Sequence, residues 1–236
     1  AMALTDFQRE VVLIAMGVAA PRGFAVGGGL GLQLHGFGDR PTDDLDSYTA
    51  AFEIEVFDDA VEALRAALGD AGFTTEVIRR LDVFRAMRVT RDGSGESFVI
   101  DLGYHGRIAP PVPNDEYGAI EALEDIVIGK VSAMAQRKAP RDYIDFDQIK
   151  RDGRWTLRLL AVTAARYNPE IGMDGFVQAL KDARRSPAAV LERYGVNKDA
   201  LADRLETYAE ELETDLEHRP LSPDEPWISP PGTASP

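Results

Sequence analysis

The chain has 236 residues, with a hydrophobic fraction of 44% and a charged fraction of 28%, which are ordinary values for a globular protein. It contains no cysteine, which excludes disulfide scaffolds, zinc fingers and thiol nucleophiles and is consistent with a cytoplasmic location. The net charge of −14 disfavours passive nucleic-acid binding, because phosphate neutralisation needs Lys and Arg. However, residues 199–225 alone hold ten acids and two bases, so the rest of the chain does not exclude an RNA partner.

The first half of the chain alternates helix and strand patterns. Phe7, Val11 and Val18 fall at helical spacing and predict an amphipathic opening helix. The apolar run 11–20 is too short to span a bilayer, so no membrane partner is expected. The following segments are predicted in chain order: a strand at 24–26, a short helix at 30–35, a strand at 45–56, a helix from 58 or 59 to 68, and strands at 74–80, 83–90 and 97–104.

A proline-rich segment, 108–113, predicts a linker, and everything after it is expected to be helical. Helices are predicted at 119–138, 141–150, 154–167, 173–183, 187–194 and 199–217. The expected fold class is α+β: a mixed sheet with helices, followed by an all-helical half. The expected domains are 1–110 and 111–217, with a disordered tail at 218–236, where six prolines and little periodicity occur.

Three glycines, Gly27, Gly28 and Gly29, lie between a predicted strand and a predicted helix. Glycine lets a backbone approach a ligand closely, and a helix N-terminus favours phosphate. The alternative is a tight turn without a ligand, and this motif alone favours the turn.

Three aspartates form the next candidate site. Alternation along a strand places Asp44 and Asp46 on one face, although a D-x-D alone is more often a solvated turn. Asp101 is the single charge inside an apolar strand, and an unpaired buried carboxylate is costly. If all three meet on one sheet, a divalent cation such as Mg²⁺ is the simplest compensation; the alternative is that Asp101 faces solvent.

Charged residues of the predicted helices give further candidates. Lys130 and Arg137 lie on or beside an apolar stripe, where they either extend to the rim or point at phosphates in a cleft between the halves. Asp142 and Asp145 share one helical face directly after Arg141. Their position also suits a helix N-terminus electrostatically, which leaves both explanations open.

Taken in order, these motifs resemble the AbiEii/MenT-like nucleotidyltransferases of toxin–antitoxin systems, within the polymerase-β-like superfamily. The family pattern consists of a glycine pair plus Ser or Thr, a D-x-D, a later strand carboxylate, a Lys and an R-D-x-x-D. It is matched here by the glycine run at 27–29, Asp44-Leu45-Asp46, Asp101, Lys130 and residues 141–145, with Arg40-x-Thr42-x-Asp44 leading into the D-x-D. The resemblance covers about 24–150, and Gly29 departs from the Ser or Thr of the family.

The resemblance implies a polymerase-β-like fold and transfer of a nucleoside monophosphate from an NTP to an acceptor hydroxyl. It implies two Mg²⁺ ions held by Asp44 and Asp46, with Asp101 completing the site and helping to deprotonate the acceptor. Lys130, with Arg137 or Arg141, would neutralise the triphosphate, and Asp142 and Asp145 would orient these cations. The glycine run would bind the nucleotide.

A tRNA 3′ end is the acceptor that the resemblance suggests, with a cognate antitoxin protein as partner. The alternatives are a small-molecule acceptor of the aminoglycoside type, a protein acceptor, and an inactive nucleotide-binding module. The last alternative follows from Gly29, which lacks the hydroxyl that would bind a terminal phosphate.

Overall fold

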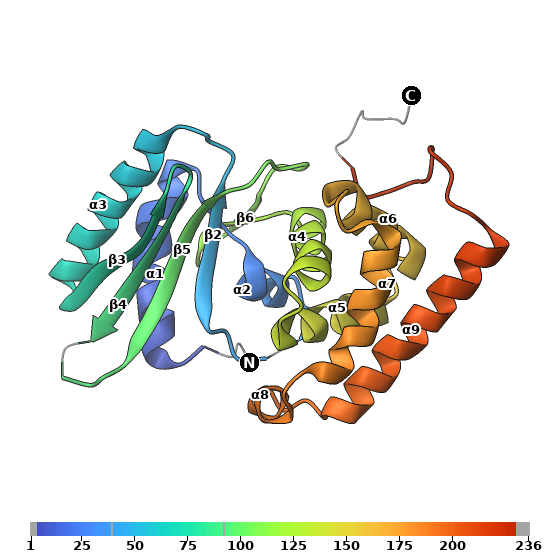
Figure 1. The fold of residues 1–236 in the computed structure, drawn as a ribbon. Coiled ribbons are helices and arrows are strands. Elements are labelled where there is room, and N and C mark those ends of the chain that lie inside the picture. The colour runs from blue at the N-terminus through green and yellow to red at the C-terminus, as the bar shows by residue number, and fades with distance from the viewer. Residues whose placement is uncertain (1–3, 39, 92, 230–236) are drawn as a thin grey trace. The chain divides into compact units, whose positions relative to one another are not determined.

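The computed structural model describes residues 4–38, 40–91 and 93–229. The chain forms two compact units, which divide between Ile126 and Val127 inside helix α4 (Leu123–Gln136). The first unit is a mixed sheet with helices, and all regular elements described in the second unit are helices (Figure 1). The predicted α+β class is therefore confirmed.

The first unit contains a seven-stranded sheet in the order β3-β4-β5-β2-β1-β7-β6. Strand β2 pairs in parallel with β5, and β1 pairs in parallel with β7, whereas the remaining pairs are antiparallel. Its elements in chain order are α1 (Asp6–Ala19), the 3-10 turn η1 (Ala20–Arg22), β1 (Ala25–Val26), α2 (Gly28–Leu34), β2 (Asp44–Thr49), α3 (Ile54–Asp70), β3 (Phe73–Leu81), β4 (Phe84–Arg91), β5 (Ser97–Tyr104), β6 (Val112–Asn114) and β7 (Gly118–Ile120).

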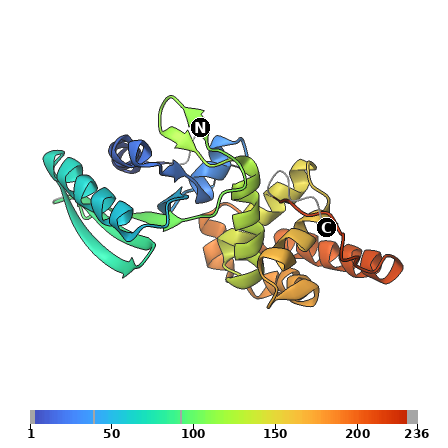
Figure 2. The ribbon, with the colours of Figure 1, turned by 90° about the horizontal axis from the view of Figure 1, so that it is seen from above.

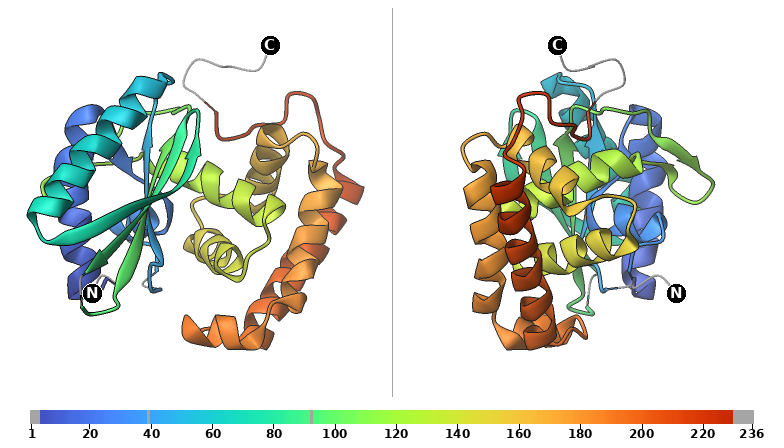
Figure 3. Two further views of the ribbon diagram at one scale, coloured as in Figure 1. Left: turned by 60° about the vertical axis from the view of Figure 1, so that its left-hand side comes forward. Right: turned by 90° about the vertical axis from the view of Figure 1, so that its right-hand side faces the viewer.

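Helices α1 and α3 cover one face of this sheet (Figures 1 and 3), and α3 lies over the β3–β4 hairpin when seen from above (Figure 2). The covered face is the core of the unit, where Val11, Leu64 and Ile100 are fully buried. Burial of such a side chain stabilises the fold by roughly 1.5–3 kcal/mol. Because side chains alternate along a strand, the residues beside Ile100 and Leu45 point to the opposite face.

Three expectations from the sequence were wrong. Strand β2 ends at Thr49 rather than near residue 56, and α3 begins at Ile54, before the aspartates that were expected to cap it. The chain after the proline-rich segment is not all helical, because β6 and β7 form a short hairpin on the sheet edge next to β1. These strands lie beyond residue 110, where the first domain was expected to end, and belong to the first compact unit.

The second unit continues α4 with a helical bundle. Helices α7 and α9 run side by side in Figures 1 and 3, and Phe176 and Leu180 of α7 and Leu205 of α9 are fully buried. Its further elements are α5 (Pro140–Asp152), α6 (Leu157–Tyr167), α7 (Gly172–Asp182), the 3-10 turn η2 (Ala183–Arg185), α8 (Ala188–Arg193) and α9 (Lys198–His218). Among the described residues, no helix has the length and apolar composition that crossing a membrane requires.

The described part of the expected disordered tail, up to residue 229, packs on α6. Arg158 is 7% exposed and binds Glu225 (2.5 Å) and Asp215 (2.7 Å). Ile228 is buried, and its backbone N–H donates to the Thr163 hydroxyl at 3.0 Å. Residues 230–236 of that expected tail lie outside the described residues.

We expect Arg158→Met to lower the free energy of unfolding by about 2 kcal/mol, because it removes the closer of the two arginines that pair with the largely buried Glu225 carboxylate, Arg158 at 2.5 Å, and leaves only Arg219 at 3.6 Å. The measurement is chemical denaturation followed by circular dichroism. Arg184→Met is the control: Arg184 also bridges two acids, Asp203 and Glu206, but on the exposed surface, where solvent screens the pair. Equal losses of unfolding free energy in the two variants would contradict the packing of the tail on α6.

Candidate active site

Three carboxylates meet on the sheet face opposite the one that α1 and α3 cover. The parallel register places Asp46 opposite Asp101, with Asp44 two residues earlier on β2. One carboxylate oxygen from each of the three residues lies within 4.8 Å of those of the other two, and all three side chains are half-buried. Asp101 is thus half-buried beside two other carboxylates, whereas the alternative considered for it was a side chain that faces solvent.

The charges of these three carboxylates oppose one another. At this separation and an effective dielectric near 20, each pair of like charges repels by roughly 3–4 kcal/mol. Oxygen ligands clustered in this way are the type that Mg²⁺ prefers. The donor set and its spacing therefore fit a divalent cation.

The glycine turn lies directly against this cluster. Gly28 has φ +57°, and a Cβ atom at that position would lie 1.8 Å from the Asp46 Oδ2 atom. The Gly27 N–H donates to the Asp46 carbonyl oxygen at 2.9 Å, which ties the turn to β2. Only glycine satisfies both the backbone conformation and the contact at position 28.

Tyr48 fixes the orientation of Asp46. Its ring lies between two glycines, because a Cβ on Gly27 would be 2.6 Å from one ring edge and a Cβ on Gly103 2.9 Å from the other. The Tyr48 hydroxyl donates to Asp46 Oδ1 at 3.3 Å. The Asp46 charge, together with burial, raises the pKa of Tyr48 well above its ordinary value, so that the phenol remains a proton donor.

We expect Tyr48→Phe to weaken divalent-cation binding about three- to tenfold, because Asp46 loses the hydrogen bond that orients it. Calorimetric titration with Mn²⁺ measures this affinity. The matched control is Tyr104→Phe, since Tyr104 is an exposed tyrosine at the end of β5. An unchanged Mn²⁺ affinity in Tyr48→Phe would contradict this role.

A buried ion cluster supports the back of the glycine turn. Glu121 is 1% exposed, and its carboxylate lies 3.2 Å from His105 Nδ1 and 3.5 Å from Arg107 Nε. The hydrogen bond with Glu121 raises the pKa of His105. Arg107 also donates to the Tyr48 carbonyl oxygen, and the Glu121 backbone N–H donates to Val26 just before the turn. The ion pair between Arg107 and Glu121 thus connects the strand that carries Tyr48 with the strand that leads into the glycine turn.

The Arg40 side chain lies against Gly29, the residue that departs from the family pattern. A Cβ on Gly29 would lie 2.8 Å from an Nη atom of Arg40, so this guanidinium rests on the turn. The Arg40 side chain is buried, and its other Nη atom donates to the Pro41 carbonyl oxygen at 3.0 Å. A positive charge therefore lies beside the turn that lacks a hydroxyl.

The remaining predicted site residues belong to the second unit. Lys130 is buried, and its amine lies 2.7 Å from an Asp145 carboxylate oxygen. Arg137 binds Asp142 through two hydrogen bonds of 2.5 and 2.9 Å, and Asp142 also accepts from the Ala139 N–H at the start of α5. The two acids therefore each hold a cation, and Asp142 caps its helix as well.

Arg141 is half-buried in the first turn of α5. The triad and the glycine turn lie in the first unit, whereas Lys130 and residues 137–145 lie in the second, and the structure brings residues together within each of these two sets.

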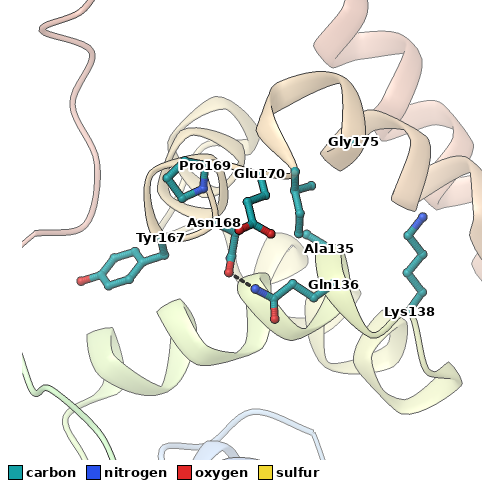
Figure 4. Close-up of a pocket in the computed structure, with 9 residues that line it drawn as sticks. Ala135, Gln136, Lys138, Tyr167, Asn168, Pro169, Glu170 and Gly175 are labelled. Carbon is teal, nitrogen blue, oxygen red and sulfur yellow. Dashed lines mark hydrogen bonds between the residues drawn. The ribbon is translucent and has the colours of Figure 1, made fainter.

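The second unit also has an open pocket of about 650 Å³, where an amide hydrogen bond joins Gln136 to Asn168 (Figure 4). Lys138 borders it but pairs with Asp182 at 2.8 Å. The pocket is lined by none of the predicted site residues, and so it adds nothing to the chemistry of the carboxylates.

A family model for the nucleotidyl transferase AbiEii toxin of type IV toxin–antitoxin systems matches residues 18–225. The chain belongs to this AbiEii family. The match includes the glycine turn, the three aspartates, Lys130 and Arg141–Asp145, so family membership supports nucleotidyl transfer as the activity of the chain. No curated protein matches the sequence.

Solved structures match this AbiEii-family chain at low sequence identity. MenT4, a nucleotidyltransferase toxin from Mycobacterium tuberculosis, is 14% identical with a TM-score of 0.50, and the match covers 81% of this chain and 76% of MenT4. JHP933 from Helicobacter pylori is 19% identical with a TM-score of 0.48, covering 93% of this chain and 96% of JHP933. The likeness to MenT4 identifies the sheet and the following helices as the nucleotidyltransferase fold.

Sequence reasoning missed the residues that support the candidate site. Tyr48 could have been found, because it continues the alternation of Asp44 and Asp46 on the same face of β2. Glu121 and His105 carry no such signal, since they are far from the motif in sequence and His105 has no ligand-type spacing. Their role became visible only through the contacts that the fold creates.

Proposed function

We propose that this protein transfers a nucleoside monophosphate from an NTP to the 3′ hydroxyl of an RNA acceptor, in a Mg²⁺-dependent reaction. The observation that carries the proposal is the convergence of Asp44, Asp46 and Asp101 beside the glycine turn, in a chain of the AbiEii family.

Asp44 and Asp46 would hold two Mg²⁺ ions, and Asp101 would complete this ligand set. Bound Mg²⁺ supplies charge neutralisation on the triphosphate and on the attacking and leaving oxygens. The spacing of the carboxylate oxygens and the close contact of Gly28 with Asp46 support this assignment.

The protein groups have separate tasks in the transfer. Asp101 would accept the proton of the acceptor hydroxyl, whose oxygen forms a bond to the α-phosphorus while the bond to the β-phosphate oxygen breaks and pyrophosphate leaves. The turn of Gly27, Gly28 and Gly29 would lie against the nucleotide phosphates.

Cations of the second unit complete the proposal. Lys130, Arg137 and Arg141 would neutralise the triphosphate, in keeping with the family pattern. Asp145 and Asp142 would orient Lys130 and Arg137, a role supported by the ion pairs of 2.7 and 2.5 Å that they form.

The acceptor proposed is a tRNA 3′ end, which would make the protein a toxin that blocks translation, opposed by a cognate antitoxin. With an NTP and a tRNA as substrates, the proposed reaction would take place in the cytoplasm. Small-molecule and protein acceptors compete with this proposal, as does an inactive nucleotide-binding module. Arg40 supports an active site, because its cation lies beside Gly29, where the family hydroxyl is missing.

The deciding experiment incubates the protein with each α-labelled NTP, Mg²⁺ and total tRNA, and in parallel with an RNA-free extract and with aminoglycosides. We expect label on tRNA for one or two NTPs, and none when EDTA replaces Mg²⁺. Label on protein or small molecules alone would contradict the RNA acceptor, and Mg²⁺-dependent NTP binding without any transfer would support the inactive module. Growth arrest on expression, relieved by the product of an adjacent gene, would support the toxin assignment.

A further inference from the structure

The sheet face that bears the triad continues across two more strands. Asp101 on β5 is opposite Ala86 on β4, and Ala86 is opposite Arg79 on β3. Since neighbouring strands lie about 4.8 Å apart, the Arg79 backbone is roughly 10 Å from that of Asp101 on the same face. A row across four strands thus runs from Asp46 through Asp101 and Ala86 to Arg79.

A β-bulge places Arg79 on this face. The pairing of β3 with β4 shifts between Val77 and Arg79, and Ile78 is the extra residue. Without the bulge, Ile78 would lie opposite Ala86, and Arg79 would point to the covered face. Bulges commonly re-aim a side chain beside a functional site. The next residue, Arg80, points to the covered face and pairs with Asp58 of α3 at 2.6 Å.

Around Arg79 the face combines aromatic, apolar and basic groups. The Arg79 guanidinium lies over the Phe84 ring, 5.4 Å from its centroid. Arg88 is 45% exposed in the neighbouring row and pairs with the exposed Glu76 at 2.8 Å. We call this surface the β3–β4 shelf; its members are Arg79, Leu81, Phe84, Ala86 and Arg88, together with Val99 of the adjoining strand β5.

The chemistry of the shelf matches single-stranded RNA. Unstacked bases stack on aromatic rings and on guanidinium planes, and arginine forks bind phosphates. A separation of roughly 10 Å corresponds to about three nucleotides at the stacked rise of about 3.4 Å. On the shelf itself two arginines stand against one glutamate, and Mg²⁺ would offset the charge of the neighbouring triad. This balance favours a polyanionic acceptor over a polycationic small molecule.

We propose that the β3–β4 shelf binds the single-stranded 3′ end of the acceptor RNA, with Arg79 and Arg88 on its phosphates and Phe84 supporting the stacked base or guanidinium, so that the terminal hydroxyl reaches Asp101. This inference rests on the proposed function for its choice of acceptor. It names the surface that would select RNA over other acceptors.

The test measures binding of a 5′-fluorescein-labelled single-stranded RNA by fluorescence anisotropy, so that it does not depend on catalysis. Arg79→Gln is expected to raise the Kd about five- to tenfold, and the double variant Arg79→Gln/Arg88→Gln about 20-fold or more. Each substitution should lower the slope of log Kd against log salt by about 0.7. Phe84→Leu should raise the Kd about tenfold through lost stacking.

Arg80→Gln is the matched control, because it removes the same charge from the same strand on the covered face. It should change the Kd less than twofold and leave transfer at the parent rate. Equal effects of Arg79→Gln and Arg80→Gln would overturn the shelf, as would an unchanged Kd in the double variant.

Kinetic measurements distinguish an incorrect assignment of the RNA-binding surface from an incorrect proposed function. If the wild type labels tRNA, Arg79→Gln should raise the KM for tRNA while the affinity for NTP, measured by calorimetry with Mg²⁺, stays within twofold. Wild-type labelling of tRNA with an unaltered KM in the variant would refute the shelf alone. If no RNA is labelled, the proposed function fails, and the anisotropy result still decides whether the shelf binds RNA. Arg79-dependent labelling of a protein in an RNA-free extract would assign the shelf to a protein acceptor and overturn the RNA proposal.

Discussion

Replacing Asp46 by asparagine is expected to reduce nucleotidyl transfer at least about 10³-fold. Asp46 connects three parts of the site in the first unit: Asp101 lies opposite it across the sheet, Gly28 lies against its carboxylate and Tyr48 donates to it. The variant removes the charge of one of the three proposed cation ligands while it keeps the shape of the side chain. Initial rates of labelled NMP transfer at saturating NTP measure the effect.

Although Asp46→Asn should lose activity, it should be more stable than the wild type when Mg²⁺ is absent. Without Mg²⁺, the Asp46 charge repels its neighbours, so Asp46→Asn should unfold at a higher temperature than the wild type in EDTA. Added Mg²⁺ should then stabilise the wild type and have little effect on the variant, because only a cation that binds the folded state raises its stability. Asp43→Asn is the control, since Asp43 is the exposed neighbour outside the triad. Transfer at the parent rate in Asp46→Asn would place the reaction elsewhere.

The triad was predictable because local patterns determined each of its parts. The period of two along β2 placed Asp44 and Asp46 together, and the cost of a lone charge in an apolar strand indicated that Asp101 needed partners. The step that connected them was the parallel pairing of β2 with β5, which follows from long-range packing rather than from either segment. The family resemblance supported that step before the fold was known.

The features that the sequence did not predict are strands too short to show a pattern and contacts between residues far apart in the chain. Strands β6 and β7 have three residues each, too few for a periodic pattern, and Pro113 argues against a strand. The packed tail depends on Arg158, which gives no sequence signal of its partner Glu225. The bulge at Ile78 likewise depends on the registers of two neighbouring strands, and it reverses the faces of Arg79 and Arg80.

Gly28→Ala is expected to reduce transfer at least about 10²-fold, although the substitution adds one methyl group and removes no functional side chain. The new Cβ would lie 1.8 Å from Asp46 Oδ2, so either the carboxylate must rotate away from Asp101 or the turn must move. Either movement would displace a proposed cation ligand or the backbone that we propose lies beside the nucleotide phosphates. Transfer rates and calorimetric Mn²⁺ titration measure the two consequences separately.

Gly36→Ala separates this effect from backbone strain. Gly36 has φ +89°, and a Cβ there would meet nothing within 4 Å, so the variant shares the left-handed conformation without touching the site. Each substitution should lower the free energy of unfolding by about 1 kcal/mol from that conformation alone, and only Gly28→Ala should lose Mn²⁺ affinity and transfer. If Gly36→Ala lost activity to the same extent, general destabilisation would account for both variants. If Gly28→Ala retained the parent Mn²⁺ affinity and rate, the close contact between the glycine turn and Asp46 would not be what positions the carboxylate.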